Sequence, residues 1–180
     1  ITEEYLRFAK LPKPVMARQD LNEILADLIH FLGAELSAAR VQVRRELAAS
    51  LPPVLADEGQ LRAAFLNLLR NSREAMADKG GEVFVATRVT DDGSVEASVR
   101  DTGGGIASGD LPRIFDPFFS TKERGTGLGL AFTHQVVQEH GGAIRCESEV
   151  GRGTTFFVLL PAASEERSSA PAPSAAAESA

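Results

Sequence analysis

Residues 125–130 read Gly-Thr-Gly-Leu-Gly-Leu, so glycine occupies every second position directly before a segment with helical apolar spacing. Small residues at the mouth of a helix expose backbone N–H groups, and the helix dipole favours anions there, an arrangement typical of phosphate binding. Lys122 and Arg124 lie just ahead and could reach phosphate oxygens. The Gly-x-x-x-x-Gly-Lys pattern of a Walker loop is absent, and the glycines follow a charged loop where a Rossmann fingerprint would follow a strand. The sequence therefore predicts a phosphate-binding loop in a fold of another kind.

Capping residues and apolar spacing indicate three helices around this loop. Asp20 can cap a first helix. Asp57 followed by Gln60 resembles a capping pair that opens a second helix. A third helix would run from Leu128 to His140. Alternating residues predict strands over 41–47, 82–89, 95–101, 143–150 and 154–160. Because these strands come largely as hairpins with the helices grouped between them, we expect an α+β fold, a two-layer sandwich in which helices cover one face of a mixed sheet.

Composition limits the partners that the chain could bind. The net charge of -6 and the isoelectric point near 5.1 argue against a nucleic-acid surface, which needs a basic face. Cys146 is the only cysteine, so no internal disulfide can form, and it alternates inward with Ile144 as a core residue would. No apolar run approaches the roughly 18 residues needed to span a bilayer, so we expect no membrane contact by these residues.

The chain divides into three parts by composition. Residues 1–19 carry apolar residues at helical spacing until Pro12 stops the pattern, either as the end of a longer helix or as a short amphipathic helix that packs on its own domain. Residues 20–162 contain the apolar patterns of one domain. Residues 163–180 consist mostly of Ser, Ala, Pro and Glu with almost nothing to bury, and we expect them to form a disordered tail.

A polar stripe accompanies the apolar stripe of the second helix. Asn67, Asn71 and Glu74 lie at positions i, i+4 and i+7 and so share one helix face. Asparagine is a poor residue for a helix interior because its amide competes for backbone hydrogen bonds. A carboxamide oxygen is a neutral ligand suited to magnesium. The stripe is either a solvated face or a magnesium site, and the motifs that follow favour the second.

Asp101 ends a predicted strand on the apolar face. It shares that face with Val95 and Val99, where an unpaired charge would be costly. The exocyclic amine of an adenine would serve as its partner, and the glycine-rich residues 102–106 would let backbone approach a flat ring closely. The alternative is that Asp101 only caps a turn. Thr154 follows another glycine-containing turn and could hydrogen-bond near the base.

Five motifs in this order resemble those of the histidine-kinase branch of the gyrase, Hsp90, histidine kinase and MutL superfamily of ATPases. They are an asparagine box at 67–75, glycine boxes at 101–106, 125–130 and 151–154, and a phenylalanine box at 115–119. The resemblance covers roughly residues 20 to 161, nearly all of the patterned sequence. It implies a Bergerat-type ATP-binding fold with ATP and Mg²⁺ as cofactors.

The resemblance also implies roles for individual residues. Asn71 would ligate Mg²⁺, Asp101 would accept from the adenine amine, and Lys122 would lie in a short lid over the phosphates. Asn67, Asn71 and Lys122 would be catalytic. The implied nucleotide-binding set is Asn67, Asn71, Asp101, Gly103, Gly105, Ile106, Phe119, Thr121, Lys122, Gly125, Thr126, Gly127, Leu128, Gly129 and Thr154. Glu74 stands where other branches carry a lysine, so no phosphate contact is assigned there.

The function implied is that of the ATP-binding catalytic domain of a two-component sensor histidine kinase in the cytoplasm. It would donate the γ-phosphoryl group of ATP to a histidine on a dimerisation domain, and it would serve a response regulator receiver domain indirectly. Residues 1–14 are similar to the end of the dimerisation helix and its linker. His30, His134 and His140 lack the acidic neighbour of an acceptor histidine, and His140 is better explained as a capping or packing residue.

Two other functions are weighed against this one. An ATP-hydrolysing conformational module of the same superfamily places a glutamate one turn before the magnesium asparagine to activate water. That position is Asn67 here, and an amide cannot act as a base at neutral pH. A nucleotide-binding regulatory domain without catalysis would be marked by a broken motif, and none of the five is broken.

Overall fold

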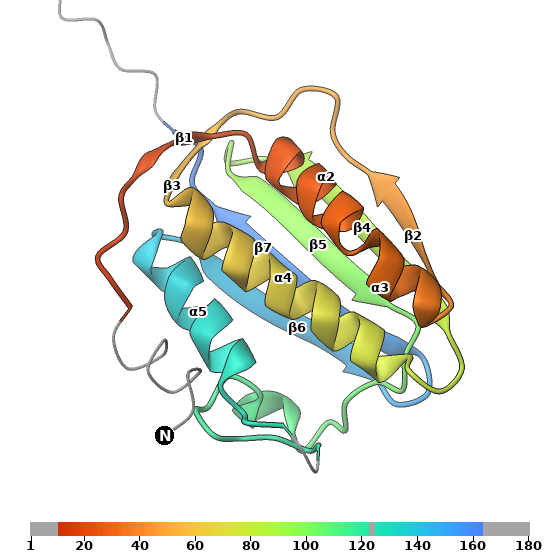
Figure 1. Ribbon diagram of the computed structural model, residues 1–180. Coiled ribbons are helices and arrows are strands. Elements are labelled where there is room, and N and C mark those ends of the chain that lie inside the picture. The colour runs from red at the N-terminus through yellow and green to blue at the C-terminus, as the bar shows by residue number, and fades with distance from the viewer. Residues whose placement is uncertain (1–10, 123–124, 164–180) are drawn as a thin grey trace, which may run out of the picture.

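The computed structural model describes residues 11–122 and 125–163 (Figure 1). The helix expected over the first residues, the tail expected beyond residue 163 and the side chain of Arg124 lie outside the described residues. None of the described helices has the length and hydropathy of a membrane-spanning segment.

A five-stranded mixed sheet forms one layer of the molecule (Figure 1). Its strands, in spatial order, are β2 (Val41–Glu46), β4 (Gly81–Val89), β5 (Val95–Asp101), β7 (Gly153–Leu160) and β6 (Ala143–Glu149). β2 pairs with β4 in parallel, and the other neighbours are antiparallel. In the register, Val99 of β5 lies between Val85 of β4 and Phe156 of β7. β5 is the middle strand of the sheet, and its last residue, Asp101, lies at the C-terminal end of that strand.

The helices form the second layer on one face of this sheet (Figure 1). They are α2 (Leu21–Phe31), α3 (Gly33–Ala38), α4 (Glu58–Ala75) and α5 (Gly129–Glu139). α4 lies between α2 and α5 and buries Leu61, Phe65 and Leu68 almost completely against the sheet. Burial of such side chains is the main favourable contribution to folding. The predicted α+β two-layer sandwich is confirmed.

Several short elements were not predicted. β1 (Ala17–Gln19) pairs with β3 (Val54–Ala56) in a small antiparallel sheet, and a 3₁₀ helix covers Leu111–Arg113. Three residues are too few to show an alternating pattern. α3 follows α2 after Leu32 alone, and Leu32 provides no side-chain cap, so only Gly33 marks the boundary between the two helices. These elements connect the layers without changing their order.

Asp57 caps α4, but the predicted capping pair is only half formed. The Asp57 Oδ1 atom accepts from the backbone N–H of Gln60 at 2.9 Å, as expected. The Gln60 Nε2 atom donates to the Pro12 carbonyl at 2.8 Å and does not return to Asp57. The backbone N–H of Asp57 donates to His140 Nε2 at 3.0 Å. His140, 3% exposed, joins the start of α4 to the end of α5 and is confirmed as a packing and capping residue.

Asp57 also binds the segment that enters the domain, since its Oδ2 atom accepts from the Val15 backbone at 2.9 Å. The hydrogen bonds from the Gln60 and Val15 backbones hold the pKa of Asp57 below its usual range. A lowered folded-state pKa contributes stability that is present above the unfolded value and is lost as pH falls through the folded value. The carboxylate of Asp57 is therefore expected to stabilise the fold at neutral pH and not in strong acid.

We expect Asp57→Ala to lower the free energy of unfolding by about 1 kcal/mol at neutral pH, the usual cost of losing a helix N-cap. Asp57→Asn, which keeps an acceptor oxygen, should lose much less. Urea denaturation of the three proteins at neutral pH and below the pKa of Asp57 measures both effects. A deficit of the alanine variant that stays constant on acidification would contradict this role of the carboxylate.

Candidate functional site

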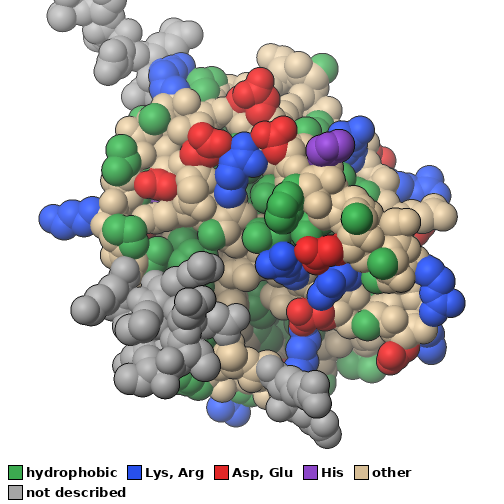
Figure 2. Space-filling model, viewed as in Figure 1, with side chains coloured by type: hydrophobic (Ala, Val, Ile, Leu, Met, Phe, Trp, Pro, Cys, Tyr) green, Lys and Arg blue, Asp and Glu red, His purple; other side chains and the backbone are tan. Residues whose placement is uncertain are grey.

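A cleft of about 820 Å³ opens between α4, the C-terminal end of β5 and the segment that leads into α5. Figure 2 shows acidic and basic side chains alternating on the helix-covered face of the molecule. Most of the residues predicted to bind nucleotide line this cleft. They are Asn67, Asn71, Asp101, Gly105, Ile106, Phe119, Thr121, Lys122, Gly125, Thr126, Gly127, Gly129 and Thr154.

Two residues of the predicted set do not line the cleft, Gly103 and Leu128. Leu128 is 3% exposed and packs in the interior at the N-cap of α5. A Cβ atom on Gly103 would lie 2.7 Å from the Cβ atom of Ala75 and 2.9 Å from Asp101 Oδ1. The absence of a side chain at Gly103 is therefore required for the loop to pack against α4. Gly104, Gly105 and Ile106 of the same stretch line the cleft, and the contact of residues 102–106 with a flat ring stays a prediction.

Asp101 forms the floor of the cleft and is 2% exposed. Its Oδ1 atom accepts from the backbone N–H groups of Gly103 at 2.9 Å and Thr154 at 3.2 Å. These bonds fix the carboxylate and leave its Oδ2 atom with capacity to accept from a ligand. Ser72, 1% exposed, lies beside Asp101, and its hydroxyl lowers the pKa of that carboxyl, although this hydroxyl makes no hydrogen bond of ordinary geometry within the described residues. A buried carboxylate and a neighbouring hydroxyl can both form hydrogen bonds with the polar edge of a ligand.

Burial raises the pKa of Asp101, and the backbone N–H groups of Gly103 and Thr154 only partly oppose this rise. The cause is the loss of water around the charged form. A buried carboxylate of this kind lowers the stability of the fold when it is charged, so its presence makes Asp101 a candidate for ligand recognition.

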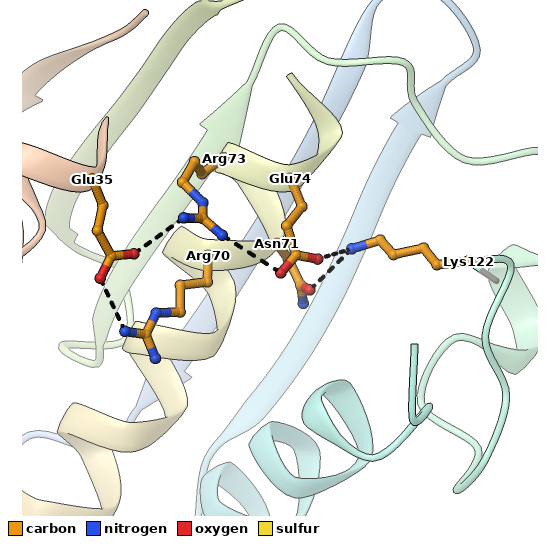
Figure 3. A network of polar contacts seen from close by, with 6 residues as sticks. All are labelled: Glu35, Arg70, Asn71, Arg73, Glu74 and Lys122. Atoms are coloured by element: carbon orange, nitrogen blue, oxygen red, sulfur yellow. Dashed lines mark hydrogen bonds and ion pairs between the residues drawn. The ribbon is translucent and has the colours of Figure 1, made fainter. Parts of the chain in front are cut away.

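The polar stripe of α4 faces the cleft. The Asn67 amide donates to the Gly129 carbonyl at 3.2 Å and so fastens α4 to the first turn of α5. One turn later, Asn71 Oδ1 lies 3.5 Å from the Lys122 Nζ atom, and Glu74 Oε2 lies 2.5 Å from the same atom (Figure 3). Lys122 thus contacts Asn71 and Glu74, two of the three side chains of the stripe.

A second group of charges continues from this stripe across the rim. Glu35 of α3 accepts from Arg70 at 3.1 Å and from Arg73 at 3.2 Å, and Arg73 lies 4.0 Å from Glu74 (Figure 3). All of these residues line the cleft. The two arginines lie within the asparagine box and could have been noted there. Glu35 could not have been found from the sequence, because the helix that carries it was not predicted.

The glycine-rich segment places the N-terminus of α5 at the cleft. The Phe118 backbone N–H donates to the Gly127 carbonyl at 3.0 Å and closes this segment into a loop. Leu128 at the N-cap provides no side-chain acceptor for the first N–H groups of α5. Such N–H groups, at the positive end of the helix dipole, are suited to bind an anion.

The donor set around Asn71 fits magnesium. Asn71 and Glu74 offer an amide and a carboxylate oxygen that already contact one cationic group. The described residues contain no cluster of three or more His, Cys, Asp or Glu side chains that could hold a metal by themselves. Magnesium is commonly held by one or two protein oxygens together with phosphates and waters, so this sparse set is appropriate.

Comparison with known proteins identifies the family. Residues 56–164 match the model of the histidine kinase-, DNA gyrase B- and HSP90-like ATPase family. The chain belongs to this family. The family members to which this chain is similar are histidine kinases. Sporulation kinase E from Bacillus subtilis (strain 168) is 38% identical over 89% of this chain and 22% of its own length. NtrB, a sensory histidine kinase/phosphatase from Rhizobium meliloti (strain 1021), is 40% identical over 69% of this chain and 36% of its own length.

A solved structure gives the same result for this ATPase domain. Full-length ShkA, crystallised in complex with AMPPNP, superposes with a TM-score of 0.80 at 31% identity and covers 90% of this chain and 35% of its own length. The predicted resemblance is therefore confirmed, and the chain is a catalytic ATPase domain of the histidine kinase type. It spans about a fifth to about a third of the relatives named here, whose other parts have no counterpart in these residues.

Proposed function

We propose that this ATPase domain binds Mg²⁺-ATP in the cleft and donates the γ-phosphoryl group to a histidine on a separate dimerisation domain. The observation that supports this most strongly is the convergence of three features on one cleft. These features are the buried acceptor Asp101, the oxygen donor Asn71 and the N-terminus of α5. Asp101 can accept from a purine amine, Asn71 can ligate a magnesium ion, and the N-terminus of α5 can bind a polyphosphate chain.

The residues of the cleft have distinct tasks in this reaction. Asp101 would bind and orient the adenine, and Thr154, which holds Asp101 through its backbone, would support that contact. Asn71 would hold the metal, which supplies charge neutralisation at the phosphates. The glycine-flanked N-terminus of α5 and Lys122 would bind phosphate oxygens. The acceptor imidazole then forms a bond to the γ-phosphorus while the bond to the β,γ-bridging oxygen breaks and ADP leaves.

The chemistry of the cleft favours transfer over hydrolysis. Asn67 has its amide bound to Gly129 and offers no carboxylate to activate a water. The acceptor histidine would come from the dimerisation domain, because none of the three histidines of this chain, His30, His134 and His140, lines the cleft. We further propose that the domain works in the cytoplasm, where ATP is supplied, and that a response regulator receives the phosphoryl group later from the acceptor histidine.

Calorimetric titration with AMPPNP in magnesium and in EDTA tests the binding part of this proposal. We expect binding that magnesium strengthens. Absence of binding at millimolar nucleotide in the presence of magnesium would contradict it.

A further inference from the structure

Glu74 and Asn71 lie one turn apart on α4 and direct their oxygens to the same cationic group (Figure 3). The Lys122 Nζ atom lies 2.5 Å from Glu74 Oε2 and 3.5 Å from Asn71 Oδ1. The other carboxylate oxygen of Glu74, Oε1, lies 4.0 Å from an Arg73 nitrogen. Glu74 therefore directs one carboxylate oxygen to the Lys122 ammonium that Asn71 also contacts, and its other oxygen faces Arg73.

The Lys122 ammonium occupies a position where a cation contacts the amide oxygen of Asn71 and the carboxylate of Glu74. Both side chains of the Lys122–Glu74 pair are nearly half exposed, at 46% and 44%. Exposed ion pairs contribute little net stability, so Lys122 can leave this position at small cost. Amide and carboxylate oxygens are also the donors that magnesium prefers. Lys122 and a magnesium ion bound at Asn71 would compete for the same oxygen.

We propose that Glu74 is a second metal-binding residue of this domain, acting with Asn71 on the magnesium ion that accompanies the nucleotide. The inference rests on the proposed function and adds a residue to its metal site. A carboxylate at this position also repels the phosphates of a nucleotide that arrives without metal. Glu74 therefore makes nucleotide binding depend on magnesium in two ways, by strengthening the metal complex and by weakening the metal-free one.

The measurable consequence is the magnesium enhancement, the ratio of the AMPPNP dissociation constant in EDTA to that in magnesium. Glu74→Gln should lower this ratio at least about fivefold, within the usual range of coupling between two ligands. Glu35→Gln is the matched control, because it removes the same charge from the same rim, where the Glu35 carboxylate accepts from Arg70 and Arg73 and not from Lys122. Its ratio should stay within about twofold of the wild-type ratio, as expected for a screened surface charge. Thermal unfolding of both variants verifies that each is folded.

A second pair of variants separates metal binding from an indirect effect through Lys122. If Glu74 acted only by holding Lys122, Glu74→Gln would change nothing in a Lys122→Met background. We expect the magnesium enhancement to fall by a similar factor in that background. Paramagnetic relaxation by Mn²⁺ should also report weaker binding of Mn²⁺ to the AMPPNP complex of Glu74→Gln.

An unchanged enhancement in Glu74→Gln would overturn the proposal, as would an equal loss in Glu35→Gln or the disappearance of the effect in the Lys122→Met background. These outcomes are distinct from a failure of the proposed function, in which wild-type protein binds no AMPPNP in magnesium at all.

Discussion

Replacing Asp101 by Asn is expected to weaken ATP binding by roughly one hundredfold, the cost typical of placing a mismatched polar group against a ligand hydrogen bond. The asparagine oxygen can keep the contacts from the Gly103 and Thr154 backbones, which end on Oδ1 of the native side chain. Its NH₂ group would then take the place of Oδ2. A donor would face the adenine amine, where the native carboxylate accepts.

The same change should reverse the preference between ATP and ITP, because hypoxanthine carries a carbonyl oxygen where adenine carries the amine. Calorimetry with both nucleotides measures this reversal, and the magnesium enhancement serves as an internal control that should persist. Wild-type ATP binding should also decline as pH falls through the raised pKa of Asp101, since only the carboxylate accepts from the amine. Equal loss of ATP and ITP binding in Asp101→Asn would show that the carboxylate does not recognise the exocyclic amine of adenine.

Stability should change in the opposite direction to binding in this variant. The folded-state pKa of Asp101 is raised above its ordinary value of 3.8 by burial. A raised folded pKa contributes stability below the unfolded value that is lost as pH rises through the folded value. At neutral pH the buried carboxylate is therefore a cost, and Asp101→Asn should unfold at a higher temperature than wild type. A lower unfolding temperature would mean that Asp101 supports the fold.

Replacing Asn71 by Asp is expected to reduce phosphotransfer by about one hundredfold or more, comparable with the loss of one group that stabilises charge in a transition state. The added charge lies at an oxygen that is 3.5 Å from Lys122 Nζ, so a carboxylate there would attract the ammonium more strongly than the amide does. It would also repel the phosphates. Both effects keep Mg²⁺-ATP from its productive position.

Gln42→Glu provides the matched control for Asn71→Asp. It makes the same amide-to-carboxylate change on β2 at an exposed position outside the cleft. Transfer rates from ATP to an isolated dimerisation domain, measured for both variants, separate a local effect from a change in net charge. Near-wild-type transfer by Asn71→Asp would remove Asn71 from the metal site.

The sequence predicted site residues best where a polar side chain is unusual for the helix or strand that carries it. Asp101 falls on the apolar face of a strand, and the asparagines of α4 fall within a helix, so each required a partner that the fold then provides at one cleft. Motif order could not reveal contacts between distant segments. Glu35 lies on a helix without a start signal, and the Asp57–His140 bond joins residues 83 positions apart. The packing of Gly103 against α4 could not be predicted, because its close neighbour, Ala75, belongs to another element.

The most direct test of the proposed function is transfer of the γ-phosphoryl group from labelled ATP to a histidine-bearing dimerisation domain mixed with this chain. We predict that label accumulates on that domain in magnesium, that it is stable to base and labile to acid as a phosphohistidine is, and that changing the acceptor histidine to alanine abolishes it. Release of inorganic phosphate at a high rate with no label on the histidine would contradict the account and identify the chain as a hydrolytic module.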